Sequence, residues 1–263
     1  MSQKRAIIPN SFTMTNMVLG FIAIIIASNG SHTSIAVAGV LVFVASFFDF
    51  IDGATARALG VSSPVGLQLD SLADAVAYGI APGFISYQAY LCRLPEIAFG
   101  INWGMVLAPI FPICATYRLA RFNADDSGNV DFSGLPSPAA GIFITSIPAL
   151  YSSRIFLIGK IDFSIPIEIF VPIFAIVALL MVSTIDYSKV FTHVVNKGKL
   201  AIIIGSVITV VGLFYFNMWL VFVLTGLYIL AGVFIYLFHL IFGKRGGGDG
   251  TPKIIETDPS NIA

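Results

Sequence analysis

Eight apolar stretches, each close to the length of a membrane-spanning helix, constrain this chain more than any other feature. They cover residues 8–28, 33–58, 66–91, 102–122, 137–153, 165–184, 199–215 and 217–241. A helix needs about 20 mostly apolar residues to cross the hydrocarbon core of a bilayer. The sequence therefore predicts an all-α fold, a polytopic membrane bundle of about eight transmembrane helices.

The composition supports this prediction. Of the 263 residues, 57% are hydrophobic and 11% are charged, whereas about a quarter of the residues in a soluble domain are charged. The formal net charge is zero, so we expect no nucleic-acid partner. Residues 1–242 are predicted to form one integral membrane domain. Residues 243–263 are rich in Gly, Pro and polar side chains, which predicts a disordered cytoplasmic tail.

The distribution of Lys and Arg predicts the orientation. If both termini are cytoplasmic, only Arg93, Arg154 and Lys160 of the 14 Lys and Arg residues fall on the outer side. Cytoplasmic loops of membrane proteins carry an excess of Lys and Arg. We therefore expect a multi-pass protein of the cell (inner) membrane, with both termini in the cytoplasm.

Four carboxylates interrupt the apolar pattern in the segment "FFDFIDGATARALGVSSPVGLQLDSLADAV". Asp49 and Asp52 are three residues apart near the end of the second predicted helix, and Asp70 and Asp74 are four apart near the start of the third. Both spacings place a pair on one helix face. A charged side chain at the centre of a membrane helix costs about 2.5–3.5 kcal/mol or more. The four groups must therefore face a polar site that compensates their charge.

Divalent cations are the compensating charge that this segment favours. Arg57 is the only Lys or Arg between Arg5 and Arg93, so side chains cannot neutralise the carboxylates. Oxygen ligands alone suit Mg²⁺, Mn²⁺ or Ca²⁺ rather than zinc. Four carboxylates suffice for two ions about 3.5–4 Å apart that clamp a phosphoryl group. Gly53 and Gly66 would let a phosphate approach the backbone, and Arg57 could pair with a phosphate oxygen.

Two other interpretations remain open at this point. Intramembrane aspartates also serve as ion relays in transporters, so a cation-coupled membrane transporter is the alternative from a different functional class. A purely structural role in helix pairing is the third interpretation. Inverted repeats would favour a transporter, and the sequence contains none that we detect.

The same segment resembles the signature of the CDP-alcohol phosphotransferase family, D-x2-D-G-x2-A-R-x8-G-x3-D-x3-D. Every fixed position matches, at Asp49, Asp52, Gly53, Ala56, Arg57, Gly66, Asp70 and Asp74. The resemblance implies a six-helix core, here extended by two helices, with two divalent cations (Mg²⁺ or Mn²⁺) at the cytoplasmic face. It also implies transfer of a substituted phosphate from a CDP-linked donor to an alcohol, with release of CMP.

Roles follow from the resemblance position by position. The metal ligands are expected to be Asp49, Asp52, Asp70 and Asp74, of which Asp74 is also the expected catalytic base. Binding of the CDP-diacylglycerol head group is expected at Gly53, Arg57 and Ser63, and at Asn10 and Thr13 near the start of the first helix.

Segments before, at the end of and after the signature resemble the family members that use L-serine as the acceptor. These are "IPNSFTMTNMVLGFIAI", "DSLADAVAYGIAPG", "YRLARFN", "FSGLPSPAAG" and "LMVSTIDYSKV". Arg118 and Arg121, which share one helix face, are predicted to bind the serine carboxylate. The expected partners are CDP-diacylglycerol, L-serine, membrane lipids and a second copy of the chain in a homodimer. Alternative acceptors are glycerol 3-phosphate and an inositol phosphate, and an archaeal lipid is an alternative donor.

Overall fold

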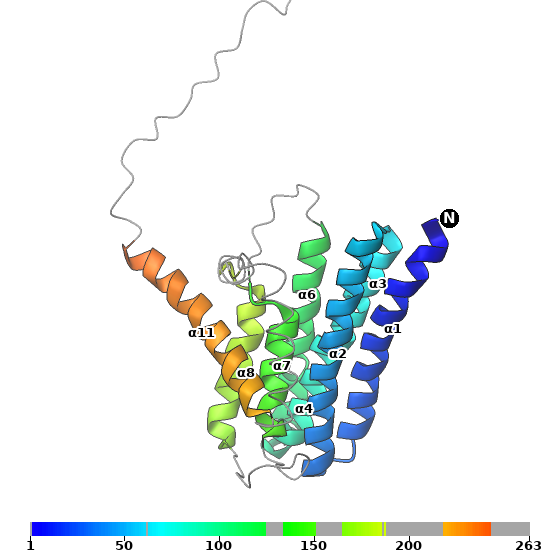
Figure 1. Cartoon of the computed structure of the whole chain (residues 1–263). Coiled ribbons are helices and arrows are strands. Elements are labelled where there is room, and N and C mark those ends of the chain that lie inside the picture. Colours follow the sequence, from blue (N-terminus) through cyan, green and yellow to red (C-terminus); the bar gives the residue numbers. More distant parts are fainter. Residues whose placement is uncertain are drawn as a thin grey trace, which may run out of the picture.

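The computed structural model describes residues 2–61, 63–124, 134–150, 165–185, 187 and 218–242. Their helices form one bundle (Figure 1). The first part contains α1 (Ser2–Ala27), α2 (His32–Leu59), α3 (Pro64–Asp74), the π-helical η1 (Ala75–Ile80) and α4 (Ala81–Ala89). The second part contains α5 (Trp103–Leu107), α6 (Ile110–Ala124), α7 (Ser137–Ala149), α8 (Ile167–Val182) and α11 (Trp219–Phe242).

The helices pack in an order that places the N-terminal ones next to each other. α1 packs along α2 and also contacts α3, while α2 contacts α7 on its other side (Figure 1). α6 contacts η1 and α8, and α11 crosses obliquely against α7. The core is built largely from alanines and from large apolar side chains such as Tyr78, Phe111 and Phe174. Small residues allow the close helix approach on which membrane bundles depend.

Local signals in the sequence explain where α2 and α3 begin and end. The hydroxyl of Ser31 accepts a hydrogen bond from the Ser34 N–H at the start of α2, and Ser63 caps α3 in the same way. Pro64 occupies the first position of α3, where a missing N–H costs nothing. α2 ends at Gly60, whose φ of 60° is the left-handed conformation that glycine adopts easily. This short turn leads from α2 into α3, which packs against α1.

The third predicted helix, 66–91, is helical from Pro64 to Ala89 but is not a regular α-helix. Its middle six residues, Ala75–Ile80, form the π-helix η1, which begins directly after Asp74. π-Helical turns inside α-helices are rare and frequently lie at functional sites. The periodicity of apolar residues does not predict this change of helical register.

The helical membrane architecture is confirmed, whereas the count of eight spanning helices is not. Within the described residues, four helical stretches are long and apolar enough to cross a membrane, namely Ile7–Ala27, His32–Leu59, Trp103–Ala124 (α5 with α6) and Trp219–Phe238. Ser137–Ala149 and Ile167–Val182 are shorter apolar helices. The predicted helix 199–215 and the predicted tail 243–263 lie outside the described residues.

One small element departs from the predicted all-α fold. β1 (Glu96–Ala98) and β2 (Ile101–Asn102) form an antiparallel hairpin after the short 3₁₀-helix η2 (Leu91–Arg93). Gly100, in the turn, has a φ of 77°. The hairpin leads from α4 into α5 at the end of the bundle that lies opposite to the N-terminus of α1 (Figure 1).

Candidate metal centre

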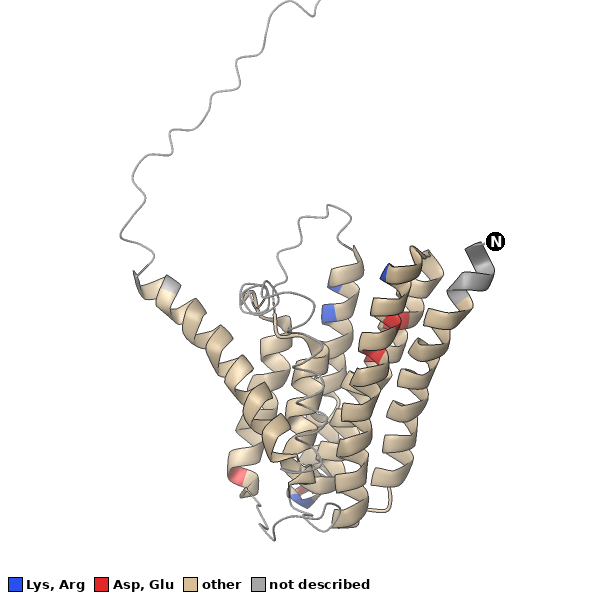
Figure 2. Cartoon of the chain, in the orientation of Figure 1, with Lys and Arg blue, Asp and Glu red and all other residues tan. Residues whose placement is uncertain are grey.

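Three of the four predicted carboxylates meet in space. Asp49 from α2 and Asp70 and Asp74 from α3 each offer an oxygen, and these oxygens all lie within 4.8 Å of one another. Figure 2 shows acidic residues gathered in the upper half of the bundle, where α2 and α3 meet at their connecting turn. The capped turn between α2 and α3 produces this arrangement, because it places the end of one helix beside the start of the next.

The donor set fits a divalent cation. Asp74 is buried, and Asp49 and Asp70 are half-buried. Three carboxylates confined at this separation repel one another strongly in a poorly hydrated bundle. An all-oxygen set of this kind suits Mg²⁺ or Mn²⁺ and lacks the thiolate and imidazole ligands that favour zinc. The residues present therefore match the cofactor that the sequence predicts.

Asp52 has a different environment from the other three aspartates. It is buried, and its Oδ2 accepts a hydrogen bond of 2.7 Å from the hydroxyl of Thr13 on α1. Asp52 is not one of the three residues whose oxygens converge within 4.8 Å. It is close enough to interact electrostatically with Asp49 and Asp70. Its role as a metal ligand stays a prediction.

A cavity of about 190 Å³ adjoins the carboxylates, and most of the residues predicted to bind the donor line it. Its walls come from α1, the C-terminal part of α2 and the start of α3. The lining includes Asn10, Thr13, Asp52, Gly53, Ser63 and Asp70. Residues that are up to 60 positions apart in the sequence therefore share one cavity beside the carboxylates.

Two glycines of the signature keep this cavity open. A Cβ atom at Gly66 would lie 3.1 Å from Ser63 Oγ and 3.5 Å from Asn10 Oδ1, so a side chain there would crowd the lining. A Cβ atom at Gly53 would lie 3.4 Å from Nη1 of Arg57, which shows that the guanidinium folds back over Gly53. The glycines thus leave polar side chains exposed to a ligand.

The two predicted serine-binding arginines of α6 make different contacts. Nη1 of Arg118 donates a hydrogen bond of 3.2 Å to Oγ of Ser137, the first residue of α7. The buried Nε of Arg118 has no hydrogen-bond partner among the described residues. Arg118 also interacts electrostatically with Asp74. Nη1 of Arg121 instead donates to the backbone carbonyl of Val182, at 3.4 Å.

Two polar contacts around the centre were not predicted from the sequence. Nδ2 of Asn16, on α1, donates a hydrogen bond of 3.2 Å to Oδ1 of Asp74. Nδ2 of Asn123 donates to Oγ of Ser71 at 2.8 Å and so ties the end of α6 to α3. A signal for Asn16 is present in the sequence, because Asn10, Thr13 and Asn16 recur every three residues in an apolar helix.

Comparison with known proteins identifies the family. Residues 6–225 match the family model described as CDP-alcohol phosphatidyltransferase. The chain belongs to this family. The match covers all the carboxylates, the cavity beside them and the two arginines of α6, so the predicted resemblance is confirmed.

Relatives from three organisms share the name CDP-diacylglycerol–serine O-phosphatidyltransferase. A CDP-diacylglycerol–serine O-phosphatidyltransferase of Helicobacter pylori is 31% identical over 245 residues, which cover 90% of this chain and 95% of the relative. The protein of that name from Bacillus subtilis is 33% identical over 158 residues, with 60% and 84% covered. The one from Methanocaldococcus jannaschii is 29% identical over 197 residues, with 73% and 81% covered.

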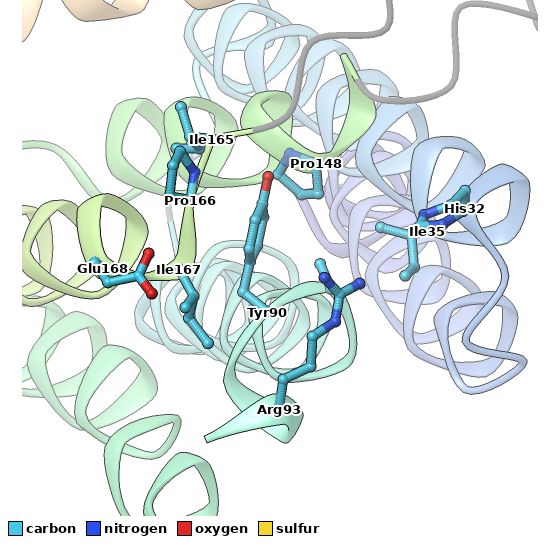
Figure 3. A pocket seen from close by; sticks show the side chains of 10 residues that line it. His32, Ile35, Tyr90, Arg93, Pro148, Ile165, Pro166, Ile167 and Glu168 are labelled. Atoms are coloured by element: carbon cyan, nitrogen blue, oxygen red, sulfur yellow. The ribbon is translucent and has the colours of Figure 1, made fainter. Parts of the chain in front are cut away.

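A larger cavity, of about 410 Å³, lies at the opposite end of the bundle (Figure 3). Its polar side chains are His32 of α2, Tyr90 and Arg93 near the end of α4, and Glu168 of α8. Pro148 and Ile165 also line it. None of the signature residues of the CDP-alcohol phosphatidyltransferase family lines this second cavity.

Proposed function

We propose that this chain transfers the phosphatidyl group of CDP-diacylglycerol to the hydroxyl of L-serine, which yields phosphatidylserine and CMP. The observation that carries the proposal is the convergence of Asp49, Asp70 and Asp74 beside a cavity lined by signature residues. Membership of the CDP-alcohol phosphatidyltransferase family supports the reaction type. The name shared by relatives from three organisms supports the acceptor and the donor.

The proposed reaction forms one phosphorus–oxygen bond and breaks another. The serine hydroxyl oxygen attacks the phosphorus of the phosphatidyl group, and the bond from that phosphorus to the bridging oxygen of the diphosphate breaks, so CMP leaves. Two divalent cations, Mg²⁺ or Mn²⁺, would be held by Asp49, Asp52, Asp70 and Asp74 and would supply positive charge at the diphosphate. Asp74 is the proposed acceptor of the serine hydroxyl proton.

The donor is proposed to occupy the smaller cavity. Asn10, Thr13 and Ser63 present polar atoms from α1 and from the start of α3, as a nucleotide requires. Arg57, folded over Gly53, would pair with a phosphate oxygen of the donor. The acyl chains would extend from this site between the helices into the bilayer.

The acceptor carboxylate is proposed to bind Arg118 rather than Arg121. The buried Nε of Arg118 has no hydrogen-bond partner within the described residues, and the side chain interacts electrostatically with Asp74. An arginine can bind a carboxylate through two parallel hydrogen bonds. The Arg121 guanidinium contacts the carbonyl of Val182 instead.

The topology proposed for the whole chain follows the sequence. Residues 1–242 form a single membrane domain of eight spanning helices, and residues 243–263 form a cytoplasmic tail. The carboxylates then open to the cytoplasm, on the side that the Lys and Arg distribution predicts. The homodimer stays a prediction.

An assay of purified protein in detergent tests the function. Radiolabelled serine should enter a lipid product only when CDP-diacylglycerol is added, with CMP released in equal amount. EDTA should abolish incorporation, and excess Mg²⁺ or Mn²⁺ should restore it. Preferred transfer to glycerol 3-phosphate or to an inositol phosphate would show that the acceptor is wrong. Cation-driven uptake of a solute into vesicles, without CMP release, would support the transporter alternative.

A further inference from the structure

Asn16 is a buried polar residue of α1 that belongs to neither the family signature nor the residues predicted to bind substrate. Its side chain is fully buried, and its Nδ2 lies 3.2 Å from Oδ1 of Asp74. Asp74 comes from α3, 58 positions later in the chain. The contact therefore joins the first helix of the bundle to the carboxylate that is proposed to act as the base.

The chemistry of the pair fixes the orientation of the Asn16 amide. An ionised carboxylate only accepts hydrogen bonds, so the NH₂ group of Asn16 must face Asp74. The carbonyl oxygen Oδ1 of Asn16 is then directed elsewhere, where it is buried without a hydrogen-bond partner among the described residues. Buried polar atoms in proteins are nearly always paired. A role in packing alone does not explain an asparagine that is paired on one side only.

We infer that Asn16 is a positioning residue, which holds one oxygen of Asp74 so that the other stays directed at the metal centre. This inference rests on the proposed function, because it assumes that Asp74 binds a cation. Thr13, one turn earlier on α1, makes the equivalent contact with Asp52 at 2.7 Å. One face of α1 therefore orients carboxylates from both α2 and α3. Hydrogen bonds from such outer residues fix the geometry of metal ligands.

Binding of Mn²⁺ to the purified protein without substrates tests the inference independently of activity. Electron paramagnetic resonance reports free Mn²⁺, so a titration gives the affinity. Asn16→Leu and the smaller Asn16→Ala should both weaken binding about 10- to 100-fold, the range seen when outer hydrogen-bond partners of metal ligands are removed. Thr145→Val is the matched control, because Thr145 is also fully buried but lies on α7 and bonds the backbone of its own helix. It should bind Mn²⁺ like the wild type.

A double-mutant cycle separates positioning from a general effect on the fold. If Asn16 acts through Asp74, adding Asn16→Leu to an Asp74→Asn protein should weaken Mn²⁺ binding no further. Losses that simply multiply in the double variant would overturn the inference. Mn²⁺ affinity within twofold of wild type in both Asn16 variants would overturn it as well.

Different results would contradict the proposed function rather than the role of Asn16. A wild-type protein that binds no Mn²⁺, or Asp70→Asn protein that binds it normally, would contradict the metal centre itself. Normal Mn²⁺ binding in the Asn16 variants, together with lost binding in Asp70→Asn, would contradict only the positioning role. Serine incorporation by the wild type then tests the reaction separately.

Discussion

The two ends of the bundle contain cavities of opposite character. At one end, a cavity of about 190 Å³ adjoins three carboxylates whose oxygens lie within 4.8 Å of one another. At the other end, a cavity of about 410 Å³ has polar and charged side chains in its lining, namely His32, Tyr90, Arg93 and Glu168 (Figure 3). The larger cavity contains groups of both charge signs, whereas the smaller one adjoins three converging carboxylates, of which only Asp74 interacts electrostatically with Arg118. Like charges that lie close together are energetically costly without a ligand. They therefore indicate a functional site better than the volume of a cavity does.

The sharpest test of this contrast is whether the two ends face opposite sides of the membrane. Leu59→Cys and Asn29→Cys would be made separately in a background that carries Cys92→Ser and Cys114→Ala. Both positions are exposed, and Asn29 lies in the turn just before α2 whereas Leu59 is the last residue of α2. A membrane-impermeant maleimide added to intact cells should label only Asn29→Cys, and inside-out vesicles should give only Leu59→Cys labelling. Permeabilised cells, in which both label, are the control, and the reversed pattern would show that the carboxylates face outward.

Removal of one carboxylate at the smaller cavity should have the largest effect on catalysis. We expect Asp70→Asn to lower the rate of CMP release by more than about 100-fold, beyond the effect of losing an outer partner of a metal ligand. The protein should stay folded, because the substitution relieves repulsion among the carboxylates. Radiolabel assays and thermal melting in detergent measure both properties. Activity within tenfold of wild type would contradict the role of Asp70.

A smaller and more selective effect is expected at Arg118. Lysine keeps the charge but loses the paired hydrogen bonds to a carboxylate, so Arg118→Lys should raise KM for serine by about 10-fold or more. KM for CDP-diacylglycerol should change little. Arg121→Lys is the matched control, since Arg121 contacts the Val182 carbonyl. A rise in the donor KM with an unchanged serine KM would reassign Arg118 to the diphosphate.

The smallest effect is expected at the larger cavity. Glu168→Gln removes a charge but leaves the side-chain shape, and Glu168, in the first turn of α8, lines the larger cavity rather than the one beside the carboxylates. Exposed substitutions of this kind usually change stability by no more than about 0.5 kcal/mol. We therefore expect CMP release and serine KM within about twofold of wild type. A tenfold loss of CMP release would mean that both ends of the bundle take part in the reaction.

The part of the site that the sequence predicted depends on residues close together in the chain. Asp49 lies before a short turn, and Asp70 and Asp74 lie after it. The turn restricts the distance between the two helix ends, so the sequence predicted that the three carboxylates would lie close together. The contacts of Asn16 with Asp74 and of Asn123 with Ser71 join helices distant in sequence. The spacing of Asn10, Thr13 and Asn16 indicates a polar stripe on the first helix, but it does not show which residue Asn16 contacts. The different contacts of Arg118 and Arg121 were also not predicted. Helix periodicity places both arginines on one face and does not show which neighbouring helix each one contacts.

For the fold, too, the sequence predicted the regular helices but not the irregular elements. The lengths of the apolar stretches predicted the bounds of the described helices to within a few residues, for example 33–58 against His32–Leu59. The apolar periodicity did not predict the π-helical segment Ala75–Ile80, which packs against α1 and α6, helices distant from it in the sequence. The hairpin Glu96–Asn102 is too short to give a period-two pattern.

The close contact of α1 with η1 has a consequence for engineering this protein. A methyl group added at Gly20 would lie 2.7 Å from the Cα atom of Ala77, so the two helices would have to separate. Gly20 is one turn beyond Asn16, and Ala77 is three residues beyond Asp74. A change that adds a single carbon in apolar surroundings would therefore lengthen the hydrogen bond at Asp74, and stabilising substitutions sought by increasing side-chain volume should avoid this pair of helices.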